Sequence, residues 1–105
     1  LPREFSLGQM YPNPFNPTTQ FTYAVPSDAY VTIKVYTTLG QEITRLVDDV
    51  RHAGDYRVQW DGKNAHGESV SSGMYLIRMT ASTIGAGRPA DMTEFIRVRS
   101  VVLLK

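Results

Sequence analysis

The sequence predicts an all-β protein, an antiparallel β-sandwich of the immunoglobulin or fibronectin III-like kind with about seven strands. Apolar and polar residues alternate with a period of two along most of the chain, which is the pattern of half-buried strands. Helical periodicity is almost missing. Turn residues interrupt the alternating segments at intervals of about ten residues. The structural alternative for the same pattern is a small β-barrel.

Length and composition define the class of protein. With 105 residues, the chain is long enough for one domain with a thin core. A formal net charge of +1 argues against a nucleic acid or a membrane surface as a partner held by bulk electrostatics. The absence of cysteine excludes disulfides, thiolate catalysis and thiolate metal sites. No apolar run is long enough for a transmembrane segment. Because the sequence begins at Leu1 rather than methionine, we expect it to be part of a longer protein.

Residues 1–19 are predicted to form a Pro-rich, extended lead-in that packs on a sandwich formed by residues 20–105. Three of the six prolines lie between Tyr11 and Thr19. Proline fixes φ, lacks an amide donor and favours extended geometry in the residue before it, so this segment is stiff. Phe15 is the residue that can anchor the segment by burial.

Turn residues separate the predicted strands. The strands cover residues 20–25, 30–36, 41–47, 55–60, 74–82 and about 92–104, and a short extended piece at 69–70 brings their number to about seven. Gly40 is expected to take a positive φ in the turn before the third strand. Residues 48–54 are polar and end in glycine, so they are predicted to form a loop, and residues 84–90 are predicted to form a mobile hairpin tip.

The predicted core gathers the inward-facing residues of these strands, namely Ile33, Val35, Val58, Trp60, Tyr75 and Ile77. Trp60 is the largest of them. Tyr75 follows a corner at Ser72 and Gly73, where its hydroxyl could tie a crossing loop to the backbone as a tyrosine corner. A plain core tyrosine is the alternative.

The sequence assembles no set of catalytic residues. His52 and His66 lie in polar segments, and neither is next to a nucleophile-elbow pattern. Asp48, Asp49 and Asp61 could supply a glycosidase pair by spacing alone, but a sandwich of this size offers little room for a substrate cleft. We therefore expect no enzymatic activity and no cofactor.

Two weak binding sites remain open at this stage. The loop Asp61–Glu68 carries several oxygen donors for calcium, but Lys63 stands where an EF-hand needs aspartate or asparagine. Aromatic side chains could form a sugar-stacking platform, and the candidates are Tyr11, Tyr30, Tyr36 and Trp60. Tyr30 and Tyr36 are expected to project from the outer face of one strand, where they more often cover neighbouring side chains.

Five spaced blocks of the sequence match one known family in order. They are Leu7–Thr19, Val31–Tyr36 with Leu39–Glu42, Ala53–Tyr56 with Val58–Gly62, Gly67 with Val70–Tyr75, and Val102–Lys105. With these blocks the chain resembles the type A C-terminal sorting domain of the type IX secretion system. It also resembles the immunoglobulin-like domain of the flagellar hook-capping protein, which shares the middle blocks. The family motif positions are Pro12, Asn13, Pro14, Phe15, Asn16, Pro17, Gly40, Gly54, Trp60, Asp61, Gly62, Gly67, Ser72, Gly73 and Tyr75.

The resemblance implies a non-catalytic domain at the C-terminal end of a protein that a Gram-negative bacterium exports through the periplasm to the cell surface or the medium. It implies two partners, the type IX outer-membrane translocon and a sortase-like peptidase. The candidate residues for translocon recognition are Arg99, Val102, Leu103, Leu104 and Lys105.

We expect a monomer that binds no nucleic acid. The rival hypothesis is an accessory Ig-like module, a spacer or a carbohydrate-binding domain, of a secreted multidomain enzyme. A sorting domain must end its parent chain, and residues 102–105 resemble a natural terminus.

Overall fold

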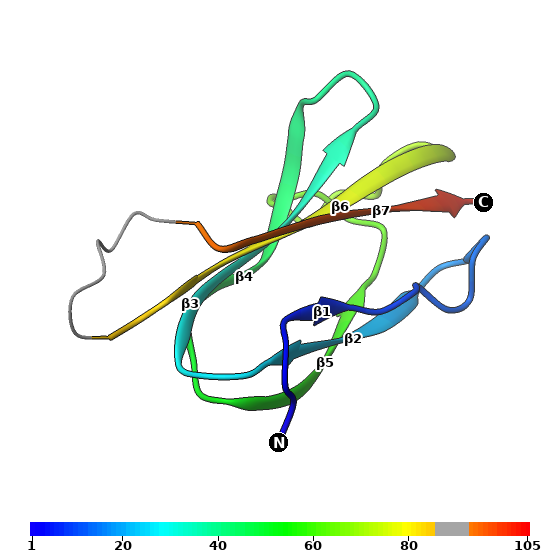
Figure 1. Ribbon diagram of the computed structural model, residues 1–105. Helices are drawn as coiled ribbons and strands as arrows, with labels where there is room; N and C mark the ends of the chain where they lie inside the picture. Colours follow the sequence, from blue (N-terminus) through cyan, green and yellow to red (C-terminus); the bar gives the residue numbers. More distant parts are fainter. Residues whose placement is uncertain (86–92) are drawn as a thin grey trace.

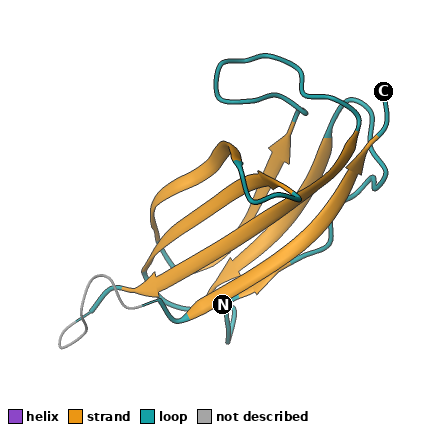
Figure 2. Ribbon diagram, turned by 90° about the horizontal axis from the view of Figure 1, so that it is seen from above, coloured by secondary structure: helices purple, strands orange, loops and turns teal. Residues whose placement is uncertain are grey.

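Two antiparallel sheets pack face to face in the computed structural model, which describes residues 1–85 and 93–105 (Figure 1). The three-stranded sheet has the order β1-β2-β5 and consists of β1 (Ser6–Leu7), β2 (Thr19–Val25) and β5 (Gly54–Trp60). The four-stranded sheet has the order β4-β3-β6-β7 and consists of β3 (Ala29–Thr37), β4 (Glu42–Arg51), β6 (Gly73–Thr83) and β7 (Phe95–Leu103). Figure 2 shows the described residues as strands and loops, with no helix among them. The predicted antiparallel sandwich of about seven strands is therefore confirmed.

No helix in the described ranges could cross a membrane. Most of the predicted hairpin tip at 84–90 lies outside the described residues, which stop at Gly85 and resume at Thr93.

The period-two pattern produces the central strands as expected. On β3, Ala29, Val31, Ile33 and Val35 are buried, while the residues between them are partly or fully exposed. β3 pairs with β6 in continuous antiparallel register, which sets Ile33 opposite Met79 and Val35 opposite Ile77. Because side chains of paired residues point to the same face of a sheet, these pairs form the inner face of the four-stranded sheet.

The predicted core residues Ile33, Val35, Trp60, Tyr75 and Ile77 are all buried. Val58 is only half-buried. It lies on β5, an edge strand of the three-stranded sheet, so no further strand covers its outer side. Trp60, at the end of the same strand, is covered by the rings of Phe15 and Tyr75.

The loop predicted at 48–54 is wrong, because β4 continues to Arg51 and β5 begins at Gly54. Backbone pairing with β3 carries β4 through its polar residues, with Thr32 opposite Asp48 and Val31 opposite Asp49. A register shift between Ile33 and Lys34 breaks the alternation of side chains on β4. A bulge of this kind hides a strand from a test that relies on strict alternation.

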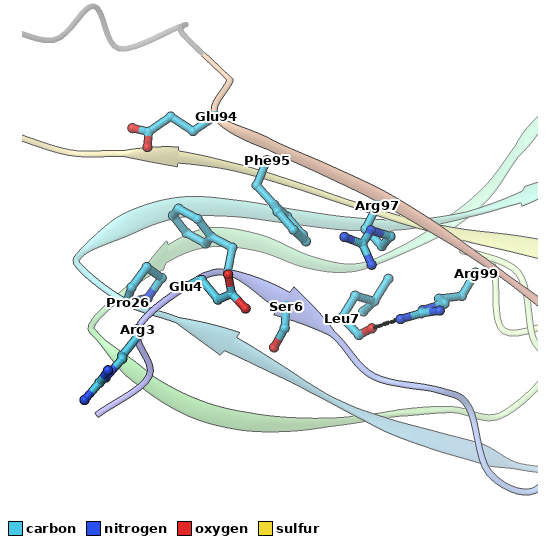
Figure 3. A pocket seen from close by; sticks show the side chains of 10 residues that line it. Arg3, Glu4, Ser6, Leu7, Pro26, Glu94, Phe95, Arg97 and Arg99 are labelled. Carbon is cyan, nitrogen blue, oxygen red and sulfur yellow. Dashed lines mark hydrogen bonds between the residues drawn. The ribbon is translucent and has the colours of Figure 1, made fainter.

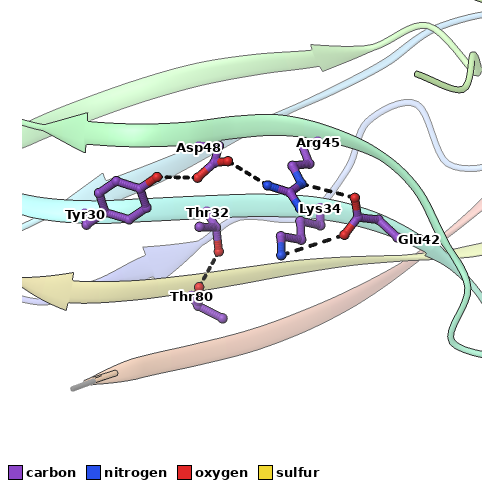
Figure 4. A network of polar contacts seen from close by, with 7 residues as sticks. All are labelled: Tyr30, Thr32, Lys34, Glu42, Arg45, Asp48 and Thr80. Carbon is purple, nitrogen blue, oxygen red and sulfur yellow. Dashed lines mark hydrogen bonds and ion pairs between the residues drawn. The ribbon is translucent and has the colours of Figure 1, made fainter. Parts of the chain in front are cut away.

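Polar side chains of β4 join a network on the outer face of the four-stranded sheet (Figure 4). The Arg45 guanidinium donates to Glu42 at 3.1 Å and to Asp48 at 2.9 Å. The Tyr30 hydroxyl donates to the other Asp48 oxygen. Hydrogen bonds from Tyr30 and Arg45 hold the pKa of the Asp48 carboxyl below its usual value. The polar residues therefore stabilise an exposed strand face rather than a loop.

The seventh strand lies elsewhere than predicted. Residues 69–70 form no strand; Ser69 makes one isolated bridge with Lys63, and the Val70 amide donates to the Gly62 carbonyl. The additional strand is β1, within the Pro-rich lead-in, where Ser6 and Leu7 pair with β2. β1 and β7 are edge strands of different sheets and contact each other, so the N-terminal segment lies beside the C-terminal strand.

Candidate functional site

The outer edge of β7 is partly covered by the Pro-rich lead-in. The Phe15 amide donates to the Val102 carbonyl at 2.8 Å, and the Leu104 amide donates to the Phe15 carbonyl at 3.0 Å. The Asn13 side chain continues this contact: its oxygen accepts from the Val102 amide at 3.0 Å, and its nitrogen donates to the Ser100 carbonyl at 3.3 Å. The lead-in thus satisfies backbone groups that an edge strand otherwise leaves open.

Phe15 fixes this segment to the core. Its side chain is 1% exposed and lies 5.4 Å from the Trp60 ring, which in turn makes an edge contact with Tyr75 at 5.3 Å. Gly62 lies against the same cluster with φ of 73°. A Cβ at this position would meet the Pro17 carbonyl oxygen at 3.4 Å and the side chains of Leu103 and Phe15 within 3.7 Å. The close approach and the positive φ both favour glycine.

The remaining positions of the sequence motifs lie on the lead-in, in turns and at the starts of β5 and β6. The Tyr75 hydroxyl donates to the Ser71 carbonyl at 2.6 Å, which is the backbone tie predicted for a tyrosine corner. The Ser72 hydroxyl accepts from the Lys105 amide at 3.0 Å. Pro12, Asn13, Pro14, Asn16 and Pro17 are exposed on the lead-in, Asp61 is exposed beside Trp60, and Gly40, Gly54, Gly67 and Gly73 have positive φ values of 89°, 155°, 82° and 152°.

The candidate recognition residues at the C-terminus divide by burial. Leu103 is 2% exposed and belongs to the core, and Val102 is half-buried. Leu104 is 54% exposed, and Lys105 is also exposed. The Arg99 guanidinium donates twice to the Leu7 carbonyl, at 3.1 and 2.9 Å. Leu104 and Lys105 are therefore the exposed members of this set, while the half-buried Arg99 lines a groove beside β7.

The structure does not assemble the calcium site considered from the sequence. Oxygen atoms in the loop Asp61–Glu68 accept hydrogen bonds from the loop itself: Asp61 from the Lys63 amide, and Asn64 from the amides of His66 and Glu68. Within the described ranges, no group of three or more acidic or histidine side chains could hold a metal ion. His52 lies in the tight connection between β4 and β5, where its Nδ1 faces the Asp28 carboxylate at 3.4 Å.

The four aromatic residues considered for sugar stacking do not form a platform. Trp60 is buried in the core. Tyr30 and Tyr36 lie on the outer face of the four-stranded sheet, whereas Tyr11 bridges to Gln20 beside the other sheet. Tyr11 is 76% exposed and borders two shallow pockets that also expose Gln9, Gln20 and Gln59.

A groove of about 590 Å³ opens between β7 and the first residues of the chain (Figure 3). Phe95, Arg97 and Arg99 line it from β7, and Arg3, Phe5 and Leu7 line it from the N-terminal segment. The rings of Phe5 and Phe95 stack at 5.7 Å, and the Arg97 guanidinium lies 5.5 Å from the Phe95 ring centre.

Sequence reasoning missed this groove and the role of Phe95 and Arg97. A signal was present, because Phe95, Arg97 and Arg99 share the register of the buried Val101 and Leu103. Charged residues at the positions of a strand that face the other sheet indicate that the two sheets separate there, because unpaired charges are rarely buried.

Comparison with protein families matches residues 13–85, more than half of the chain, to the model described as the FlgD Ig-like domain. No curated protein sequence matches the chain.

Solved structures share the fold. FlgD from P. Aeruginosa aligns with a TM-score of 0.61 and 21% identity, over 81% of this chain and 61% of that one. Dimeric latent PorU from Porphyromonas gingivalis aligns with a TM-score of 0.67 and 19% identity, over 93% of this chain and 9% of that one. PorZ, a surface component of the type-IX secretion system of the same bacterium, aligns with a TM-score of 0.56 and 16% identity, over 95% of this chain and 12% of that one. The chain spans less than two thirds of each of these proteins.

Proposed function

Because this chain belongs to the FlgD Ig-like domain family, we propose that it is a non-catalytic member that directs an exported parent protein through the type IX translocon to the cell surface. The observation that carries the proposal is that four of the five motif blocks meet at one place. Phe15, Trp60 and Tyr75 form a continuous aromatic cluster, and Gly62 and Leu103 close around Phe15. The most widely separated blocks thus hold the last strand in a defined position.

The exposed residues directly after this strand are the proposed recognition element. Leu104 and Lys105 offer an apolar side chain and a cation next to the half-buried Val102. Leu103 and Arg99 position them, Leu103 through the core and Arg99 through the Leu7 carbonyl. In this proposal the lead-in, residues 1–19, and the sandwich, residues 20–105, act together, because the lead-in fixes the strand that the translocon contacts.

The fold likeness to PorU and PorZ is in keeping with this proposal, since PorZ is an essential surface component of a type-IX secretion system, although FlgD shares the fold to a similar degree. The partners are then the outer-membrane translocon and a sortase-like peptidase, and the domain acts as a monomer. Of the two rival functions, a carbohydrate-binding module would depend on the exposed Tyr11 ring, whereas an accessory spacer needs no binding site.

A gain-of-function experiment tests the proposal. The chain is fused behind a fluorescent protein with a periplasmic export signal, in a bacterium that has a type IX system and in a matched strain without its translocon. We expect the reporter at the surface or in the medium of the first strain and in the periplasm of the second. Retention of the reporter in the periplasm of both strains would contradict the proposal.

A further inference from the structure

The N-terminal half of β7 keeps an open backbone edge. The N–H and C=O groups of Val102 both bond to the lead-in, so they point away from β6. In an antiparallel strand, alternate residues point their backbone groups to the same side, so Ser100, Val98 and Ile96 present theirs outward as well. Asn13 reaches only as far as the Ser100 carbonyl. In the part of the chain that the structure describes, no hydrogen bond reaches the outer side of Val98 or Ile96.

The inner side of this open edge is cationic. Arg97 and Arg99 point into the groove beside β7 (Figure 3). No carboxylate forms an ion pair with either guanidinium among the described residues. The groove as a whole is lined by three arginines, Arg3, Arg97 and Arg99, and two glutamates, Glu4 and Glu94, so its net charge is positive. The Glu94 carboxylate accepts from the Thr83 amide. Arg99 uses two N–H groups on Leu7 and keeps donors for a ligand, because a guanidinium has five.

The outer side of the same edge is apolar. Ile96 is 57% exposed and Val98 is 46% exposed. Val98 also borders a shallow hollow of about 250 Å³, whose other walls are Tyr36, Gly40, Leu76 and Arg78, the residue paired with Val98 on β6. One strand edge therefore offers unpaired backbone groups with arginines on one face and aliphatic side chains on the other.

We propose that the edge of β7 at Ile96 and Val98 binds an extended acidic peptide by strand addition. The backbone of the peptide pairs with the outward groups of β7. Because strand side chains alternate between faces, every second peptide residue enters the groove, and a carboxylate there meets Arg97 and Arg99. The residues between them are aliphatic and cover Ile96 and Val98. The ligand is thus a segment in which acidic and aliphatic residues alternate.

A second copy of this chain fits the same edge poorly. Antiparallel pairing of two β7 strands around Val98 would set Arg97 and Arg99 of one copy beside the same arginines of the other. Like charges directly opposite one another destabilise a strand pair. The charge of the groove therefore favours an acidic partner over self-association.

This inference goes beyond the proposed sorting function, because it assigns a site distinct from Leu104 and Lys105 and requires no translocon. Its test uses the isolated chain with a capped synthetic peptide of alternating valine and glutamate. Failure of this test leaves the sorting experiment unaffected.

Titration calorimetry measures the affinity, and NMR amide exchange locates the peptide. We expect binding that weakens with salt and slower exchange of the Ile96 and Val98 amides. Arg97→Glu should weaken binding about tenfold or more, the loss expected for a charge-assisted contact. Arg57→Glu, the same charge change on the exposed face of β5, should leave binding nearly unchanged.

Three results would overturn the inference. The first is equal binding of a peptide with lysine in place of glutamate. The second concerns two N-methylated peptides, one methylated at the amides of its valines and the other at those of its glutamates. One of these two sets of amides has to pair with β7, so unchanged affinity for both peptides would exclude strand addition. The third is concentration-dependent dimerisation of the free chain with protection of Ile96 and Val98, which would make a second copy the occupant.

Discussion

Phe15 and Leu103 lie side by side in a parallel bridge, although they come from opposite ends of the chain. The bridge consists of the two backbone hydrogen bonds between Phe15 and β7, and both side chains are buried next to Gly62. The Pro-rich lead-in is therefore an integral part of the sandwich, and loss of this contact should affect both stability and the accessibility of the last strand.

Phe15→Ala removes the anchor of the lead-in. Because the ring is buried against Trp60, we expect the free energy of unfolding to fall by about 3–5 kcal/mol. Chemical denaturation followed by tryptophan fluorescence measures the change. Tyr11→Ala is the matched control, since its ring is 76% exposed and its removal should cost less than about 0.5 kcal/mol. A loss below about 1 kcal/mol for Phe15→Ala would mean that the segment does not depend on its anchor.

Asn13→Ala opens the edge of β7 without touching the core. The Val102 amide loses its acceptor and the Ser100 carbonyl loses its donor, so we expect destabilisation of about 1 kcal/mol. Hydrogen exchange should accelerate at the Val102 amide. Asn16→Ala, an exposed asparagine of the same segment, should change neither quantity. Unchanged exchange at Val102 in Asn13→Ala would show that this contact does not persist in solution.

Gly62→Ala tests the closure around Phe15. A non-glycine residue at φ 73° costs about 1–2 kcal/mol, and the added Cβ would press on the Pro17 carbonyl oxygen. We expect a lower melting temperature than in the wild type. Gly85→Ala should leave the melting temperature unchanged, because an added Cβ there meets no atom within 4 Å. Equal melting temperatures for the two variants would contradict the close packing.

The Asp48 network predicts a dependence of stability on pH. Hydrogen bonds from Tyr30 and Arg45 lower the pKa of Asp48 in the folded state, so its ionised form stabilises the fold above about pH 4, the value for the unfolded chain. This contribution is lost as the pH falls through the lower, folded-state pKa. We expect Asp48→Asn to reduce the loss of stability on acidification, measured by urea denaturation between neutral and acidic pH. Asp55→Asn, on the exposed face of β5, should keep the wild-type pH dependence.

The strands were predictable where the alternation is unbroken. β3 and β6 alternate strictly and pair without a register shift, so sequence and structure agree to within about one residue at each end. β4 escaped prediction beyond Val47 because a bulge shifts its register and its polar side chains stabilise one another on the surface. Periodicity registers side-chain burial, but backbone pairing determines where a strand ends.

The sequence indicated which residues matter at the candidate site, but not which of them contact one another. Phe15 was identifiable as an anchor because it is the one large apolar residue between Pro12 and Pro17. Its pairing with Leu103 was not, because a parallel bridge between distant segments leaves no local pattern. The groove beside Arg97 was equally hidden, since it exists only where the N-terminal segment and β7 separate.

The central claim is that Leu104 and Lys105, directly after β7, carry the sorting information, and its most direct test leaves the core intact. Deletion of residues 102–105 would also remove the buried Leu103, so the sharper change is the double variant Leu104→Asp with Lys105→Glu, at two exposed positions. The matched control makes the same changes at Leu39 and Lys63, which are exposed on the turn between β3 and β4 and on the loop after β5. Circular dichroism first establishes that both variants fold.

The measurement is the fraction of the reporter fusion that surface protease reaches in the translocon-competent strain. The account predicts that the Leu104→Asp, Lys105→Glu variant accumulates in the periplasm, while the Leu39→Asp, Lys63→Glu control reaches the surface like the wild type. Normal surface delivery of the folded Leu104→Asp, Lys105→Glu variant would contradict the account.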